Sequence, residues 1–278
     1  MGGGSITQRW GSALAELLRF SPLLLNLAWR DIRVRYTQSL LGIAWAILLP
    51  LSMMLVFTFV FTRAIGTSVA LDVEMPYPLF AYAGLVPWTF FSVSLNNCIN
   101  SLVANRNLVT KVYFPREVLP LSCVAGSLVD FCIAGTVLLG LAAYFRWTGQ
   151  YTARATWAVA LVPFLVLVQM ALTAGLGMAL AALHLFFRDV RPVFAVVIQL
   201  WMFLSAVVVP VPGGGSLFAA AIAWNPMVPL ITSYRDCLLK GKWPEATGLA
   251  YAAFVSLAVL LAGWAGFRRA SVRFAEQI

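Results

Sequence analysis

Residues 155–187 read ATWAVALVPFLVLVQMALTAGLGMALAALHLFF, and this stretch contains no Asp, Glu, Lys or Arg. A helix needs roughly 20 apolar residues to cross the hydrocarbon core of a bilayer, so this segment is long enough for one crossing. Further uncharged stretches occupy residues 36–62, 75–105, 192–234 and 246–267. The pattern therefore predicts an integral membrane protein built from helices.

The composition agrees with this prediction. Apolar residues make up 62% of the chain and charged residues 10%, and the mean hydropathy is +0.88, far from the values of an ordinary soluble domain. Polar and apolar residues do not alternate as they do in barrel strands, so we expect an all-α protein. One more apolar span is interrupted by Asp130 alone. The six expected spans lie near residues 40–62, 79–103, 119–145, 155–183, 194–211 and 247–267.

The whole chain, residues 1–278, is predicted to form a single transmembrane domain. Residues 1–39 would form a cytoplasmic N-terminal region, residues 40–267 the six-span bundle and residues 268–278 a cytoplasmic tail. Apolar residues at helical spacing near the N-terminus lie opposite charged ones, which predicts an amphipathic helix on the membrane surface. The apolar set is Trp10, Leu14, Leu17 and Leu18, and the charged set is Arg9, Glu16 and Arg19.

The uncharged stretch at 192–234 is too long for one helix, and prolines divide its second half. We expect one crossing, followed by a re-entrant or interfacial helical hairpin on the outer side before the last span. The prolines concerned are Pro210, Pro212, Pro226 and Pro229.

The distribution of Lys and Arg predicts the orientation, because cytoplasmic loops carry an excess of these residues. With both termini inside, the inner segments hold thirteen of the nineteen basic residues: Arg9, Arg19, Arg30, Arg33, Arg35, Arg106, Lys111, Arg116, Arg188, Arg191, Arg268, Arg269 and Arg273. The outer segments hold Arg63, Arg146, Arg154, Arg235, Lys240 and Lys242. The net charge of +9 then reports topology and contact with anionic lipids, and no soluble basic domain is present to bind nucleic acid.

Catalytic and metal-binding motifs are not found in the sequence. There is no phosphate-binding loop, no nucleophile elbow and no metal-ligand spacing, so we expect neither an enzyme nor a bound metal. The single histidine, His184, is expected to be packed or interfacial. Asp130 is the one acid inside a span; it could carry a proton, contact a polar substrate or fix helix packing.

Three basic segments on the inner side are more specific. They read LAWRDIRVRYTQSLLGIAW at 27–45, NRNLVTKVYFPREVLPL at 105–121 and FFRDVRP at 186–192. Each by itself is explained as an anchor at the level of the lipid head groups. Together with WNPMVPLITSYRDCLLKGKWP at 224–244, they resemble the membrane subunit of the type-two ABC exporters that carry bacterial polysaccharides such as O-antigen or teichoic acid.

The resemblance implies export of a lipid-linked, O-antigen-like polysaccharide across the bacterial inner membrane. It also implies pairing with a second copy of this chain and with two separate ATPase subunits that hold ATP and Mg. Alternatives are a teichoic acid, a capsule polymer or a small hydrophobic drug as substrate. A membrane anchor that recruits a soluble enzyme is a further alternative of a different class.

The resemblance also implies site residues. The ATPase would contact the connection between spans two and three, with a lesser contact at the third basic segment; these residues are Asn107, Lys111, Tyr113, Phe114, Arg116, Arg188 and Asp189. A gate helix before span one would receive the substrate pyrophosphate through Arg30, Arg33, Arg35 and Tyr36, unless these residues only anchor the chain to anionic lipids.

Sugar rings stack on aromatic side chains, and the resemblance implies that spans one and five build the channel. Candidates for its wall are therefore Trp45, Phe57, Phe61, Trp201 and Phe203. Membrane proteins also place aromatic residues in interfacial belts, which is the competing explanation. In the hairpin, Trp224, Asn225, Tyr234 and Arg235 could gate the exit or end helices at the interface. The family pattern has a proline after Phe203–Leu204–Ser205, where this chain has Ala206.

Overall fold

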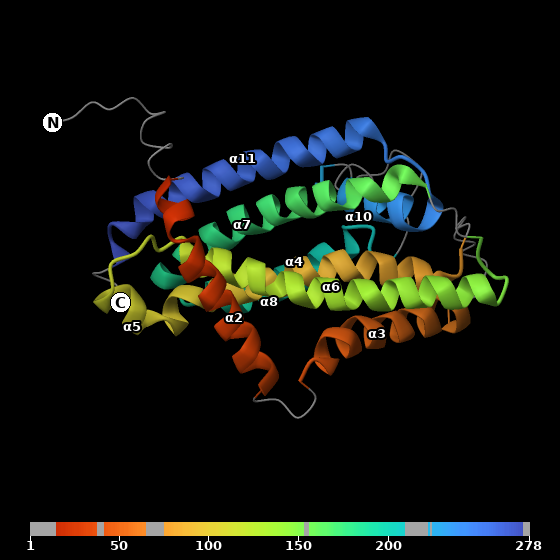
Figure 1. Ribbon diagram of the computed structural model, residues 1–278, viewed down its shortest axis with the longest axis horizontal. Coiled ribbons are helices and arrows are strands. Elements are labelled where there is room, and N and C mark those ends of the chain that lie inside the picture. Colours follow the sequence, from red (N-terminus) through yellow and green to blue (C-terminus); the bar gives the residue numbers. More distant parts are fainter. Residues whose placement is uncertain are drawn as a thin grey trace.

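The computed structural model describes residues 15–37, 42–64, 75–152, 156–208, 222 and 224–274. Within these residues the chain consists of helices and their connections, and no strand occurs among them, as predicted. Figure 1 shows α4, α6, α7 and α11 running along the long axis of the molecule, side by side.

Five helices of the described part are long and apolar enough to cross a membrane. They are Ala44–Thr62, comprising α3 (Ala44–Phe59) and its continuation, α4 (Tyr77–Ala104), α6 (Val118–Trp147), Trp157–Phe186, comprising a short 3₁₀ turn and α7 (Val162–Phe186), and α11 (Ala246–Ser271). They correspond to the predicted spans 40–62, 79–103, 119–145, 155–183 and 247–267, and each end differs from its prediction by a few residues or less.

The fifth predicted span, 194–211, corresponds to a shorter helix. Helix α8 (Val190–Phe203) has 14 residues. At a rise of about 1.5 Å per residue it covers about 21 Å, less than the roughly 30 Å of hydrocarbon. A sixth crossing therefore stays a prediction.

The chain turns directly after α8. Ala206 has a φ of 52°, in the left-handed region. Proline, whose ring holds φ near −65°, cannot adopt this conformation, so this turn is compatible with alanine and not with the proline of the family pattern.

Helix α2 (Ser21–Thr37) lies obliquely across the part of the bundle near α5 (Arg106–Lys111), whereas α3 runs alongside the other part (Figure 1). Residues 15–19, just before α2, are helical. Arg9, Trp10 and Leu14 of the predicted interfacial helix lie outside the described residues.

The described part of the predicted hairpin comprises α10 (Met227–Arg235) and a π-helical turn (Asp236–Lys240). Its first arm, with Pro210 and Pro212, lies outside the described residues. Asn225 begins α10: its Oδ1 accepts a hydrogen bond from the Met227 N–H at 3.0 Å, and its Nδ2 donates to the Leu204 carbonyl at 2.9 Å. Asn225 thus joins the start of α10 to the end of α8.

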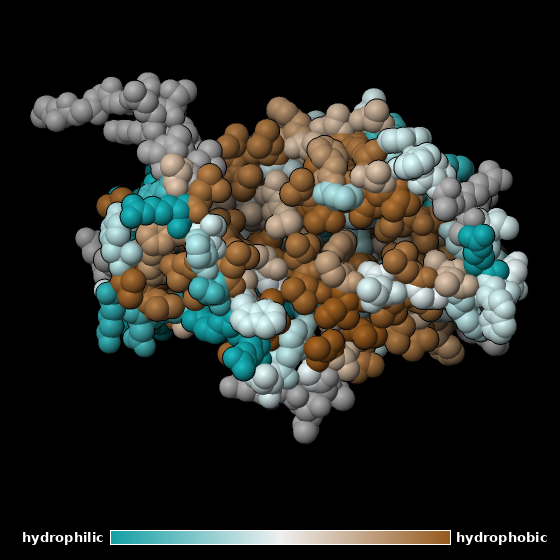
Figure 2. Space-filling view, in the orientation of Figure 1, coloured by the Kyte–Doolittle hydropathy of each residue, from teal (hydrophilic) through white to brown (hydrophobic). Residues whose placement is uncertain are grey.

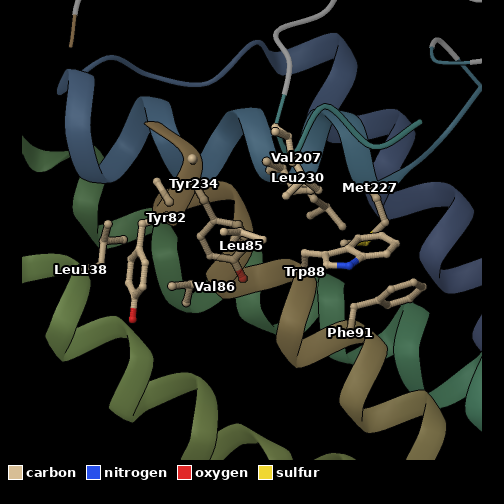
Figure 3. Packing of buried hydrophobic residues seen from close by; sticks show 14 of the residues in the cluster. Tyr82, Leu85, Val86, Trp88, Phe91, Leu138, Val207, Met227, Leu230 and Tyr234 are labelled. Carbon is tan, nitrogen blue, oxygen red and sulfur yellow. The ribbon is translucent and has the colours of Figure 1, made fainter. Parts of the chain in front are cut away.

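Helix α4 forms the centre of the core. Figure 3 shows Tyr82, Leu85 and Trp88 of α4 gathered with Met227 and Tyr234 of α10. By contrast, α3 buries little, and Leu55, Val56 and Phe59 are 58%, 60% and 67% exposed. Figure 2 shows hydrophobic residues over the middle of one face, with hydrophilic residues at the α5 end and along α2. This distribution is that of a protein surrounded by lipid at its middle.

Candidate functional site

Helix α2 packs on α6 through a narrow buried face. Its buried residues are Leu27 and Ala28, and Leu27 joins a cluster at the α5 end of the bundle. Gly126 of α6 lies beneath this contact, since a methyl group there would touch the Ala28 carbonyl and Ile32 at 3.7 Å. The arginines of α2 lie on its other faces: Arg33 is exposed, and Arg35 reaches α6.

The C-terminal end of α2 reaches the acid within span three. The Arg35 guanidinium forms an ion pair with Oδ2 of Asp130, and the Tyr36 hydroxyl donates a hydrogen bond to its Oδ1. The side chains of Arg35 and Asp130 are 34% and 20% exposed. Burial, and then the hydrogen bond to Asp130, raises the pKa of Tyr36 above its usual range, so the phenol stays a donor at neutral pH.

Two groups that the sequence indicated separately, the gate helix and the intramembrane acid, therefore form one site. The partner of Asp130 comes from the helix before the spans. This contact shows Asp130 holding α2 on α6, which is one of the three roles considered for it.

A mainly apolar cavity of about 320 Å³ opens on one side of the ion pair. Its walls come from the end of α2 and from α3, α4 and α6. The apolar lining includes Trp45, Leu49, Pro50, Phe90 and Phe131, and the polar lining includes Arg35, Asn97 and Asp130.

A second cavity of about 490 Å³ lies on the other side of Arg35, between α2, α4 and α6. It is more polar, because α4 presents a row of amides and hydroxyls into it: Asn97, Asn100, Ser101 and Asn105. Arg35 and Asn97 line both cavities. Arg35 thus stands between two mainly apolar cavities, of which the second has more polar side chains in its wall.

The other two arginines of α2 differ from each other. Arg30 lines the polar cavity and donates to Asn105 Oδ1 and to Asp31 Oδ1, each at 2.8 Å. Arg33 is exposed on the surface of the helix. The four gate-helix residues therefore occupy three environments: paired with α4, exposed, and bound to Asp130.

The predicted ATPase-coupling residues between spans two and three fall into an exposed group and a group packed within the chain. Asn107 and Lys111 of α5 are exposed, and Tyr113 is 89% exposed. Phe114 is only 7% exposed and packs in the cluster at the α5 end. Arg116 donates to the Ser271 carbonyl and lies 5.7 Å from the centre of the Phe274 ring. Phe114 and Arg116 are thus engaged within this chain, which leaves Asn107, Lys111 and Tyr113 available to a partner.

The third basic segment forms a cationic cavity. Arg188 and Asp189 are exposed, and Arg106, Arg188 and Arg191 line a space of about 410 Å³ with His184. Nδ1 of His184 is buried and has no hydrogen-bond partner in the described part of the chain. His184 is thus partly buried in the wall of this cavity, in agreement with the expected packed or interfacial position.

The candidate channel aromatics make contacts between spans. Phe57 of α3 and Phe203 of α8 meet edge to face with ring centres 6.4 Å apart. Trp201 packs on Phe91 at 5.3 Å, and Phe61 lies on Tyr77 at 5.5 Å. Trp45 is 54% exposed and lines the apolar cavity. Among the described residues, no three His, Cys, Asp or Glu side chains come together as metal ligands.

Comparison with known proteins gives consistent matches over most of the chain. The profile of the family described as "ABC-2 type transporter" matches residues 22–239. The chain is 35% identical to the O-antigen export system permease protein RfbA of Myxococcus xanthus over 266 residues, which covers 95% of this chain and 98% of that protein.

Two further relatives are more distant. A protein of the same name from Klebsiella pneumoniae is 28% identical over 256 residues, covering 91% of this chain and 94% of the relative. The polysialic acid transport protein KpsM of Escherichia coli is 25% identical over 247 residues, covering 86% and 90%.

Proposed function

Because the chain belongs to the ABC-2 type transporter membrane family, we propose that it exports a lipid-linked, O-antigen-like polysaccharide across the bacterial inner membrane. The chain is the membrane permease of an ABC-2 type polysaccharide exporter. Among its relatives, the one with 35% identity over nearly the whole of both chains is named for O-antigen export. That likeness supports the substrate class.

The geometric observation that carries the proposal is the position of Arg35. The residue lies at the end of α2, between a mainly apolar cavity and a second one into which α4 directs amide and hydroxyl groups. A lipid-linked glycan has the same three parts: a polar sugar, an anionic phosphate and an apolar tail. The arginines of α2 would receive the phosphate, since guanidinium groups bind phosphate oxygens in pairs.

The proposed assembly contains two copies of this chain and two ATPase subunits. Apolar faces of α3 and α8 remain uncovered in one chain: Val193, Val196 and Leu200 of α8 are 59%, 60% and 62% exposed. A second copy would cover part of these faces. The exposed residues Asn107, Lys111 and Tyr113 would contact the ATPase, which would bind ATP and Mg, so this chain itself would catalyse no reaction.

A capsule polymer is the second candidate substrate, because the Escherichia coli relative is named for polysialic acid transport. Its identity of 25% is lower than that of the O-antigen relatives, which is why O-antigen comes first. Teichoic acid and hydrophobic drugs stay as less supported alternatives.

The test is deletion of the gene in its own host, with a plasmid copy as the rescue control. We expect the polysaccharide to disappear from the cell surface and to accumulate inside, still attached to its lipid. Extraction of that lipid-linked material and analysis of its sugar and lipid parts then identify the substrate. Normal surface polysaccharide with a raised sensitivity to hydrophobic drugs would contradict the proposal in favour of drug export.

A further inference from the structure

We propose that a cavity at the α5 end of the bundle binds the head group of an anionic bilayer phospholipid with two phosphates, as cardiolipin has. It is the space of about 410 Å³ lined by Arg106, Arg188, Arg191 and His184, and it shares no lining residue with the two cavities beside Arg35. The lipid would be a bound component of the permease and not its substrate, so this inference does not rest on the proposed function.

Three guanidinium groups line this cavity without a counter-ion. Arg106 begins α5, Arg188 lies between α7 and α8, and Arg191 is in the first turn of α8. No Asp or Glu of the described residues lines the cavity, and these three side chains form no ion pair or hydrogen bond in the described part of the chain. Like charges repel each other more strongly at the edge of a bilayer than in water, so the arrangement is stable only with an anion.

The start of α8 and the imidazole of His184 add to the attraction for an anion. Arg191 and Pro192 line the cavity and are the second and third residues of α8, so the positive end of this helix dipole lies there. Nδ1 of His184 is buried and has no hydrogen-bond partner among the described residues. A buried polar atom without a partner costs free energy, and a head-group oxygen reached by a turn of the ring would remove that cost.

The rim of the cavity favours a lipid over a soluble anion or a carboxylate of the ATPase. Val103 lines the cavity and is 50% exposed, and Val193, which follows the lining residue Pro192, is 59% exposed. Val196, further along α8, is 60% exposed. These apolar side chains continue from the cationic cavity along a helix that runs away from the α5 end. The acyl chains of a lipid held by its head group would lie on them.

The number of guanidinium groups favours two phosphates over one. A phosphodiester carries one negative charge, and one guanidinium binds two of its oxygens. Phosphatidylglycerol would therefore leave two of the three cations unpaired, whereas cardiolipin would leave one. The volume of about 410 Å³ lies within the range of roughly 300–1,000 Å³ found for small-molecule sites. Basic pockets between helices on the cytoplasmic side are the kind of site that such head groups occupy.

The experiment measures lipid binding to the purified complex of this permease with its ATPase in detergent, by native mass spectrometry. Cardiolipin and phosphatidylglycerol are titrated separately, the second at twice the concentration so that the negative charge is equal. We expect cardiolipin to saturate at one lipid per permease chain and to bind at least about tenfold more tightly, because both phosphates contribute. Phosphatidylethanolamine, which has no net charge, should show no saturable binding.

Substitutions test whether the cavity is the site. Arg191→Gln should weaken cardiolipin binding about tenfold or more, because a charge-assisted pair of hydrogen bonds is lost. Arg106→Gln, on another helix, should act in the same direction and keeps the test decisive if Arg191→Gln does not fold. Arg269→Gln is the matched control, since Arg269 is exposed at the same end of the bundle and does not line the cavity. Cardiolipin should raise the unfolding temperature of the wild-type and Arg269→Gln complexes and raise that of Arg191→Gln less.

Equal binding of phosphatidylglycerol at equal charge, or an equal loss in Arg269→Gln, would overturn the proposal, since either result shows attraction to surface charge without a defined site. Loss of the ATPase from the purified Arg191→Gln complex would also overturn it, in favour of a contact with that partner. Inorganic pyrophosphate that binds as tightly as cardiolipin would assign the cavity to a soluble anion. The deletion experiment above reads export itself, so a failure here leaves the proposed function standing.

Discussion

Arg235 carries its guanidinium into the packed core, where backbone carbonyls surround it. Its nitrogens donate to the carbonyl oxygens of Phe80, Ala206 and Val207 at 3.2, 2.7 and 2.6 Å, and its charge lies 3.6 Å from the centre of the Phe80 ring. No carboxylate pairs with it within the described residues, and burial lowers its pKa. One side chain thus joins α4, the turn after α8 and the end of α10.

Gly84 makes room for this side chain. A methyl group at this position would lie 2.3 Å from Nη2 of Arg235 and 2.6 Å from the Val207 carbonyl. Gly84→Ala must therefore displace the guanidinium from its carbonyls, and we expect a loss of about 1–3 kcal/mol of stability, as for other overpacked cores. Thermal unfolding of the purified permease in detergent measures the effect.

The control for Gly84→Ala is Gly135→Ala in α6, where a methyl group would meet nothing within 4 Å. That variant should unfold at the wild-type temperature or slightly above, because alanine favours the helix. A Gly84→Ala protein as stable as Gly135→Ala would show that Arg235 can be repositioned without cost.

At the scale of the helices, the segment directly after α5 exposes Tyr113 and buries Phe114. We expect Tyr113→Ala to weaken the coupling of substrate to ATP hydrolysis at least about tenfold, because exposed tyrosines are frequent energetic centres of interfaces. The measurement is substrate-stimulated ATPase activity of the co-purified complex in lipid.

Val112→Ala is the matched control for Tyr113→Ala, since Val112 is its neighbour and is 53% exposed. It should retain normal stimulation. Phe114→Ala should instead lower the thermal stability of the permease by itself, as expected for a buried ring. Full stimulation in Tyr113→Ala would exclude the segment after α5 as the ATPase contact.

Helices α7 and α11 approach each other through two glycines. A methyl group on Gly263 would lie 2.1 Å from the Gly175 carbonyl oxygen, and one on Gly175 would lie 2.5 Å from the Val259 carbonyl oxygen. Small residues at such contacts let helices in lipid pack closely. We predict that Gly263→Ala separates α7 from α11 and destabilises the permease by about 1–3 kcal/mol.

Gly266→Ala, one turn further along α11, meets nothing within 4 Å and serves as the comparison. Both variants add one methyl group to α11, and they differ in whether that group meets the backbone of α7. Equal unfolding temperatures for them would indicate that the helices can shift apart freely, and would contradict close packing as a source of stability.

The bounds of a helix could be predicted from the sequence where the helix coincides with one uninterrupted apolar run. The predicted span 79–103 is α4 at Tyr77–Ala104, because charged or proline-rich segments flank one uncharged run. Helix α8 ends early at a left-handed turn around Ala206, a backbone conformation that hydropathy does not encode. The pairing of Arg35 with Asp130 was equally hidden, since it depends on the angle at which α2 crosses α6. Burial of Phe114 is likewise decided by packing between distant segments.

At the scale of the whole molecule, contacts join distant segments at the α5 end of the bundle. Arg268 of α11 lies 3.2 Å from Glu117, just before α6, and 3.9 Å from Glu16. Arg116 binds the carbonyl of Ser271. The last residues of α11, the start of α6 and the segment before α2 thus lie at one end, where the sequence places the cytoplasm.

These contacts also bear on the sixth crossing. Helices α7 and α11 both run toward the α5 end, since His184 lies in a cavity with Arg106 and Arg268 meets Glu117. The chain between them must therefore return to the opposite end. Val208 is already there, because its carbonyl accepts a hydrogen bond from Tyr77 at the start of α4. We therefore expect α8 and the turn after it to cross the membrane together, although the helix alone is too short.

Single cysteines in a cysteine-free background test this topology with a membrane-impermeant maleimide on intact spheroplasts. We expect Gln150→Cys and Trp243→Cys to be labelled from outside, and Tyr113→Cys and Arg269→Cys to react only after the membrane is permeabilised. Each of these four positions is exposed on the single chain, so access depends on the side of the membrane. If the chain does not cross between α7 and α11, the five remaining spans place Trp243→Cys inside and Arg269→Cys outside. Labelling of Trp243→Cys only after permeabilisation would therefore exclude the sixth crossing, while labelling of it beside Gln150→Cys requires the chain to cross between α7 and α11.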